Sequence, residues 1–185
     1  MELSQVIPPP VPPEQNSAAT FREAAVLIET DQSLLTTNSC SAMRTVVPGK
    51  AMICSQQPDV RGFDSTNSWE EVTAAVDENE KSFGLLRQII DKPNFDFQIK
   101  YQQGIADLDF TNLYLASLKI AALRLETAAL CDLHRGDTAS AVKDLRAMLA
   151  LIKAARGERF VISELVRMAI TSIAVTINWE ILQSP

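Results

Sequence analysis

The chain has 185 residues, of which 46% are hydrophobic and 22% charged, and its net charge is −6. This length can bury a sizeable core in one globular unit. The 17 Lys and Arg residues are scattered, so the composition argues against a nucleic-acid partner, which requires clustered basic residues. Glycine is scarce at 6 residues and aromatic residues make up 6%. This balance predicts an all-α protein, with an extended arm over 1–16 and a single helical domain over 17–185.

The N-terminal arm contains a proline-rich run over 7–13. Proline fixes φ and removes amide donors, so the run predicts an extended polyproline-II segment. PxxP spacing is present, but no Arg or Lys flanks it, which favours a spacer over an SH3-type ligand. Residues 1–7 carry neither a basic region nor a long apolar region, so we expect no signal peptide.

The first helix is predicted over 17–30, capped by Asn16 or Ser17. Its apolar residues share one face at spacings of three and four, namely Ala18, Phe21, Ala24, Ala25 and Ile28. The following segment, 31–66, has no sustained period and is rich in turn-forming residues. A small β-hairpin with strands at 45–47 and 51–54 is one interpretation of it.

The three cysteines are Cys40, Cys54 and Cys131. Their odd number and the lack of CxxC spacing argue against a zinc site and against a disulfide framework. Free thiols are favoured, and a Cys40–Cys54 disulfide is the alternative in an oxidising compartment.

The second helix is predicted over 68–91, where Ser68 and Glu71 have the spacing of a capping box. Its apolar face comprises Trp69, Val72, Val76, Phe83, Leu86 and Ile90. The charged residues on its other side, Asp77, Glu78, Glu80 and Lys81, indicate a solvated face. Residues 95–101 then alternate apolar with polar side chains, which predicts an extended segment crossing the core.

A helical hairpin is predicted from a helix over 108–135 and another over 138–156. Gly136 suits the left-handed C-cap of the first helix and Asp137 the N-cap of the second. The first helix has an apolar stripe of Leu108, Leu115, Leu118, Ala122, Leu125, Ala129 and Leu133. In the second, we expect Ala141, Leu145, Met148, Leu149 and Ile152 to face inward. We expect Lys143, Asp144, Arg146 and Lys153 to face largely outward.

The last helix is predicted over 158–183, and its residues 168–179 carry no charge. Thr171, Ser172, Thr176 and Asn178 dilute the apolar run, so a helix buried against several neighbours is favoured over a membrane span. The sequence ends soon after this helix, without a polar turn to cover it. We therefore expect a fragment or one side of an interface, with self-association or a protein partner at 158–183.

The hairpin around Gly136 resembles a tetratricopeptide unit over some 30 residues. The matching positions are Leu125, Ala129, Gly136, Asp137 and Ala141. Asp132 departs from the usual aromatic residue and Met148 from the usual alanine. No second copy follows at a 34-residue period, whereas a solenoid needs about three units. The resemblance implies a local tetratricopeptide-like hairpin within a bundle of about five helices.

A wider resemblance rests on four further parts of the sequence, namely 9–12 with 16–19, Tyr101 with Gly104, 135–137 and 162–170. In them the chain resembles an uncharacterised group of mainly helical bacterial proteins. Members of that group often carry a membrane-anchoring helix before the proline segment and further helices after the last one here. The resemblance implies that a full-length form is associated with the cell envelope, and it implies no activity.

No catalytic, cofactor-binding or metal-binding residue is predicted. The single histidine, His134, lies at a helix C-terminus, where the helix dipole favours a cation, and no Glu precedes it at the di-iron spacing. No P-loop, GxGxxG or GxSxG motif is present. Asp107 and Asp109 suit the first turn of a helix, and Glu164 with Arg167 suits a structural i,i+3 ion pair.

Two hypotheses for function remain. The first is a non-catalytic helical scaffold or protein-interaction module, associated with the envelope in its full-length form, that binds through a groove or an exposed helix face. The alternative is a small-molecule-binding or enzymatic domain with its site between segment 31–66 and the helical core. An apolar surface patch over the last helix favours the first, and a deep pocket lined by polar groups with shifted pKa values favours the second.

Overall fold

A computed structural model describes residues 10–30, 69–92, 94–97, 108–156 and 161–184. This part of the chain forms an all-α bundle of six α-helices with two short 3₁₀ turns. The α-helices are α1 (Ala18–Thr30), α2 (Trp69–Glu78), α3 (Glu80–Gln88), α4 (Leu108–His134), α5 (Thr138–Ala155) and α6 (Val161–Gln183). The 3₁₀ turns are η2 (Pro13–Gln15) and η5 (Ile89–Asp91). The all-α prediction is confirmed.

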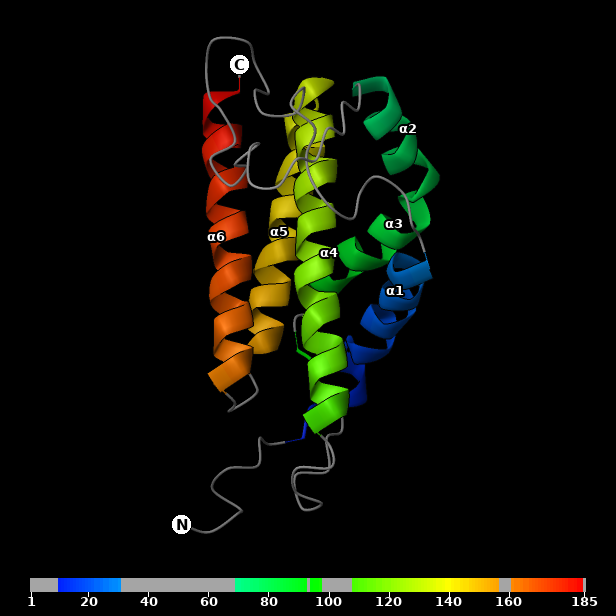
Figure 1. Ribbon diagram of the computed structural model, residues 1–185, viewed down its shortest axis with the longest axis vertical. Coiled ribbons are helices and arrows are strands. Elements are labelled where there is room, and N and C mark those ends of the chain that lie inside the picture. The colour runs from blue at the N-terminus through cyan, green and yellow to red at the C-terminus, as the bar shows by residue number, and fades with distance from the viewer. Residues whose placement is uncertain (1–9, 31–68, 93, 98–107, 157–160, 185) are drawn as a thin grey trace, which may run out of the picture.

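The bundle is organised around α4, which separates two groups of helices (Figure 1). On one side α4, α5 and α6 pack against one another, and on the other side α1 and α2 contact α4 while α3 bridges α1 and α5. Since α4 has neighbours on several sides, it is apolar around most of its circumference. Four alanines of α4 are fully buried at these contacts, namely Ala121, Ala122, Ala128 and Ala129. Small side chains there let neighbouring helices approach closely.

Asn16 joins the start of α1 to the extended segment 94–97. Its Oδ1 accepts hydrogen bonds from the backbone N–H groups of Ala18, at 2.9 Å, and Asp96, at 3.0 Å. Its Nδ2 donates to the Asp96 carbonyl at 3.0 Å, and the Ser17 hydroxyl donates to the Lys92 carbonyl at 2.6 Å. The predicted capping of the first helix is therefore provided by Asn16. The described part of the arm is extended at Pro12, but 13–15 forms a 3₁₀ turn, which corrects the prediction of a fully extended arm.

An aromatic cluster fixes the other end of segment 94–97. The rings of Phe97 and Tyr114 stack with centroids 3.9 Å apart, and Phe21 meets Phe95 edge-on at 5.6 Å. Arg22 also donates to the Phe97 carbonyl at 3.1 Å. Residues 95–97, the described part of the segment predicted to be extended, form no helix or strand, and their aromatic side chains join α1 to α4. Residues 98–101 lie outside the described part of the chain.

The helix predicted over 68–91 is divided into α2, α3 and η5, so the prediction of one continuous helix is wrong. The break lies at Asn79, whose Nδ2 donates to the Ala75 carbonyl at 2.9 Å. The Asn79 carbonyl accepts bonds from both the backbone N–H and the hydroxyl of Ser82. Asparagine competes in this way with the regular helical bonds, and a new helix begins after it. Ser68 and the side chains of Trp69 and Glu71 lie outside the described residues.

The predicted turn between α4 and α5 is present. Gly136 has φ 81°, in the left-handed region that glycine adopts without strain. The Asp137 N–H donates to the Asp132 carbonyl at 2.8 Å and the Gly136 N–H to the Leu133 carbonyl at 3.0 Å. This pattern is a Schellman motif. Asp137 then accepts from the Ser140 N–H at 3.0 Å and caps α5, which completes a tight antiparallel hairpin.

We expect Gly136→Ala to lower the free energy of unfolding by about 1 kcal/mol, because a Cβ is strained at positive φ. Gly84→Ala is the matched control, since Gly84 lies inside α3 and a Cβ there would meet no atom within 4 Å. That change should raise the free energy of unfolding by about 0.5–1 kcal/mol through helix propensity. Urea unfolding of both variants would show effects of opposite sign; destabilisation of the same size in both would contradict the assignment.

Candidate functional site

Helix α6 lies at the edge of the bundle, and in the described part of the chain its main packing partners are α4 and α5 (Figure 1). Its inner face carries the buried residues Ser163, Ile170, Ile173, Ala174, Ile177 and Glu180. The expectation of a helix buried against several neighbours is therefore wrong for its opposite side. Of its most apolar 18-residue stretch, only 28% is buried.

A second apolar stripe runs along the exposed side of α6. We call it the outer face and define it as Val161, Leu165, Met168, Ser172, Val175, Trp179 and Leu182. The six apolar members are 57% to 80% exposed, and Ser172 is also exposed. Isolated exposed apolar residues are common on protein surfaces, whereas a row of six large ones on one side of a helix is unusual for a surface that faces only water.

The spacing of the outer face is regular. Successive members lie four, three, four, three, four and three residues apart. This alternation is the a/d pattern of a heptad repeat, in which one helix presents a row of side chains to another helix. The inner face takes up the positions on the other side of α6 and packs on the bundle. Helix α6 is thus apolar on two sides, and only one of them is covered by the described chain.

Few charges border the outer face. Glu164 and Arg167 form an exposed ion pair with each other, with Arg167 Nε donating to Glu164 at 2.8 Å, as predicted. This pairing lowers the pKa of the Glu164 carboxyl. The hydroxyls of Thr171 and Thr176 donate to backbone carbonyls one turn earlier, at 2.7 and 3.2 Å. The polar groups beside the outer face are therefore largely neutral or satisfied within α6 itself.

Helix α6 is the one described helix that is long and apolar enough to cross a membrane by length and composition. The same criterion is met by core helices of soluble proteins, so it does not by itself define the environment of the outer face. Polar side chains do lie along it, because Ser172 is a member of the outer face and Thr171 and Asn178 lie beside it.

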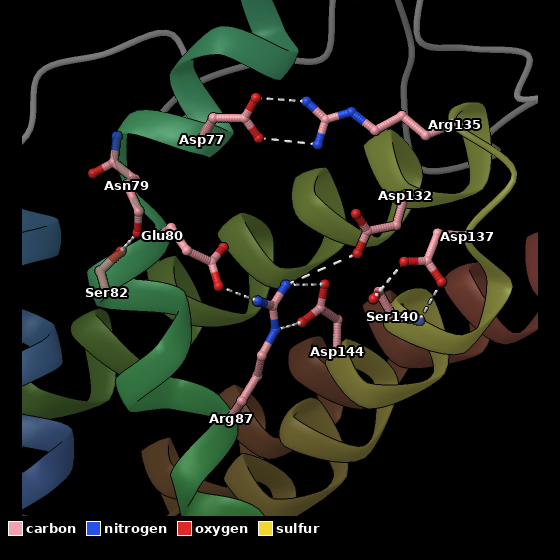
Figure 2. Close-up of polar contacts among 10 residues, drawn as sticks. All are labelled: Asp77, Asn79, Glu80, Ser82, Arg87, Asp132, Arg135, Asp137, Ser140 and Asp144. Carbon is pink, nitrogen blue, oxygen red and sulfur yellow. Dashed lines mark hydrogen bonds and ion pairs between the residues drawn. The ribbon is translucent and has the colours of Figure 1, made fainter.

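A buried ion cluster around Arg87 is the main polar feature elsewhere in the bundle (Figure 2). Arg87 on α3 donates from Nε to Asp144 Oδ1 at 2.6 Å and from Nη2 to Oδ2 at 3.1 Å. Its Nη1 donates to Glu80 at 2.9 Å, and its Nη2 lies 3.9 Å from Asp132 Oδ2. Asp144 is fully buried, so the expectation that it faces outward is wrong. A buried carboxylate needs such a partner, and α3 supplies it to α5.

The cluster holds three carboxylates around one guanidinium. Burial, together with the nearby Asp144 carboxylate and against the opposing effect of Arg87, raises the pKa of Asp132 to about 6. Burial also raises the pKa of Asp144, although its bonds to Arg87 act in the opposite direction. Burial of Arg87 acts against its charge, but the bond to Asp144 and the nearby carboxylates outweigh this, and the pKa of Arg87 is raised. Because Arg87 joins α3 to α4 and α5, we interpret the cluster as structural.

Other polar residues are placed as follows. Arg135 makes an exposed two-bond ion pair with Asp77 of α2, at 2.8 and 3.0 Å, which was not predicted (Figure 2). His134 is exposed at the end of α4, as its position predicted. Glu180 is buried on the inner face of α6, where burial raises the pKa of its carboxyl.

The remaining candidate residues are only partly described by the structure. Cys131 is a buried cysteine on α4 that forms no disulfide with a described residue, whereas Cys40, Cys54, Asp107 and the Asp109 side chain lie outside the described residues. Leu149 was expected to face inward and is 47% exposed instead. Across the described ranges, no group of three His, Cys, Asp or Glu side chains is placed to hold a metal ion.

Comparison with known proteins identifies no relative: no family model, no curated protein and no solved structure matches the chain.

Proposed function

We propose that this protein is a helical interaction module whose outer face on α6 binds a helix of a partner protein. The observation that carries the proposal is the exposed row of six large apolar side chains at heptad spacing. Helices recognise one another through such rows, because each side chain inserts between four residues of the facing helix. These apolar side chains contact water in the isolated chain, so their burial against a partner is favourable.

The scaffold suits this role. The inner face of α6 packs on α4 and α5, and the Schellman turn at Gly136 joins these two helices, so α6 is in place before any partner arrives. A preformed helix loses little conformational entropy on binding, so more of the burial energy contributes to affinity. The tetratricopeptide-like sequence of the α4–α5 hairpin also supports an interaction role. We propose this role at the cell envelope in a full-length form, because the chain resembles an uncharacterised group of mainly helical bacterial proteins, which often carry a membrane-anchoring helix.

The second hypothesis, a small-molecule site beside segment 31–66, stays a prediction, since that segment lies outside the described residues. Three groups with shifted pKa values, Arg87, Asp132 and Asp144, lie together in the Arg87 cluster, where Arg87 donates two hydrogen bonds to Asp144. The apolar row on α6 is the observation expected of an interaction module.

Photo-crosslinking in the source cell tests the proposal. A photoreactive amino acid at position 175 lies within the outer face, and one at Val26 on α1 is the matched control, because these two valines are 62% and 60% exposed. We expect a specific adduct from position 175, with the crosslinked peptide mapping to an apolar helical segment. Equal labelling from both positions, or an adduct only from position 26, would contradict the proposal.

A further inference from the structure

We infer that the partner of the outer face is the outer face of a second copy of this chain, so that two α6 helices pair across a two-fold axis. This inference rests on the proposed function and specifies its partner. Pairing through the same patch on both copies is the commonest way in which soluble proteins form dimers.

The heptad spacing of the outer face favours a second copy as its partner. A row with a/d spacing packs best on another row with the same spacing, since knobs of one helix then meet holes of the other along the whole contact. The outer face keeps this spacing without interruption from Val161 to Leu182, nearly the full length of α6. Every copy of the chain therefore presents a surface that matches it.

The residues that flank the outer face also favour a second copy as its partner. Charged residues beside an a/d row select partners by attraction and repulsion. Here the flanking positions are almost free of charge, namely Ile162, Glu164, Ala169, Thr171, Thr176 and Asn178. The one carboxylate, Glu164, is already paired with Arg167 of the same helix. Two copies can therefore meet at this face without repulsion, although the whole chain carries −6.

The centre of the outer face fits a two-fold axis. Ser172 is the middle one of its seven members and has a small polar side chain. A single polar residue in an a/d row weakens the contact but restricts its register. In a symmetric pair centred on this position, each serine lies near the axis whether the helices run parallel or antiparallel.

The size of the outer face determines how tightly two copies are expected to bind. A helix of 23 residues is about 35 Å long and about 10 Å wide, which gives roughly 350 Å² of projected contact per copy. Standard stable interfaces bury about 800 Å² per partner. We therefore expect a reversible dimer in the micromolar range rather than an obligate one.

A lipid surface is the main competing occupant, and the residues argue against it. Helices that lie on membranes carry Lys and Arg along the polar side. On α6 the one basic residue is Arg167, held by Glu164, and polar Ser172 lies within the apolar row itself.

The test is sedimentation equilibrium of the full chain from low to high micromolar concentration, with Val175→Glu and Val26→Glu as matched variants. We expect the wild type and Val26→Glu to dimerise with similar dissociation constants, and Val175→Glu to remain monomeric. Circular dichroism and thermal unfolding at low concentration should be the same for all three, which excludes misfolding as the cause. A monomeric wild type, or a Val175→Glu chain that dimerises like the wild type, would overturn the inference.

Disulfide crosslinking provides a second test, in which dimerisation produces a covalent product instead of being lost. In a chain with Cys40→Ser and Cys54→Ser, Ser172→Cys should give a covalent dimer on mild oxidation, and Val26→Cys should not. Equal yields from both would contradict the inference.

Different results would contradict the second-copy inference and the proposed function. If the purified chain is monomeric while position 175 crosslinks in cells to a helix of another protein, the second-copy inference falls and the proposed function stands. If the wild type instead binds vesicles of phosphatidylethanolamine and phosphatidylglycerol, and Val175→Glu does not, both fall.

Discussion

Replacement of Arg87 by methionine is expected to lower the free energy of unfolding by about 3–5 kcal/mol, the usual consequence of leaving a buried charge without its partner. Asp144 is fully buried and receives two hydrogen bonds from Arg87. Without them, Asp144 must either take up a proton or remain as an uncompensated charge. Chemical unfolding near neutral pH, followed by circular dichroism, measures the effect.

Arg135→Met is the matched control for that experiment. Arg135 also makes two hydrogen bonds to one carboxylate, Asp77, but both side chains are substantially exposed. Exposed pairs contribute about 0–1 kcal/mol, so this loss should be small. The double variant Arg87→Met with Asp144→Leu should recover much of the stability, since an apolar pair can replace a buried ion pair. Equal losses in the Arg87 and Arg135 variants would contradict the structural role of the buried cluster.

Asp132→Asn is expected to stabilise the protein in neutral and alkaline solution. The folded state raises the pKa of Asp132 from 3.8 to about 6, so between these values the folded state binds more protons than the unfolded state. The free energy of unfolding therefore falls as the pH rises through this window. A shift of this size corresponds to a loss of about 3 kcal/mol above pH 6 as an upper bound, at ~1.4 kcal/mol per pKa unit.

The Asp132→Asn chain lacks this proton uptake. Its stability should match that of the wild type near pH 4 and exceed it at pH 8, as measured by urea unfolding across the pH range. Asp91→Asn, which removes an exposed carboxylate at η5, is the matched control for the loss of one negative charge. A lower stability of Asp132→Asn at pH 8 would show that attraction by Arg87 outweighs the burial of this carboxylate.

Local sequence patterns predicted the helices well where one face of a helix is buried. The starts of α1 and α5 and the end of α4 follow from Asn16, Asp137 and Gly136, because these residues form hydrogen bonds with near neighbours in the chain. The break at Asn79 was missed, although asparagine is a competitor of helical bonds, because the apolar period continues through it from α2 into α3.

The buried ion cluster could not be predicted from local patterns. Asp144 lies between Lys143 and Arg146 on α5, which indicates a solvated position, and its partner Arg87 is 57 residues away. Only the packing of α3 on α5 brings them together. Similarly, the spacing of the outer face is present in the sequence. However, the apolar residues of the outer face alternate in the sequence with those of the inner face. The two faces can be distinguished only because the inner one packs against α4 and α5.

The most direct test of the central claim, that the outer face of α6 is an interface between two copies, is hydroxyl-radical footprinting of the wild type at low and high concentration. Met168 and Trp179 are reactive, exposed members of the outer face, and His134 is an exposed, reactive residue at the end of α4. We predict that oxidation of Met168 and Trp179 slows as concentration rises, while that of His134 does not change. Oxidation of Met168 and Trp179 at the same rate at all concentrations would contradict the claim.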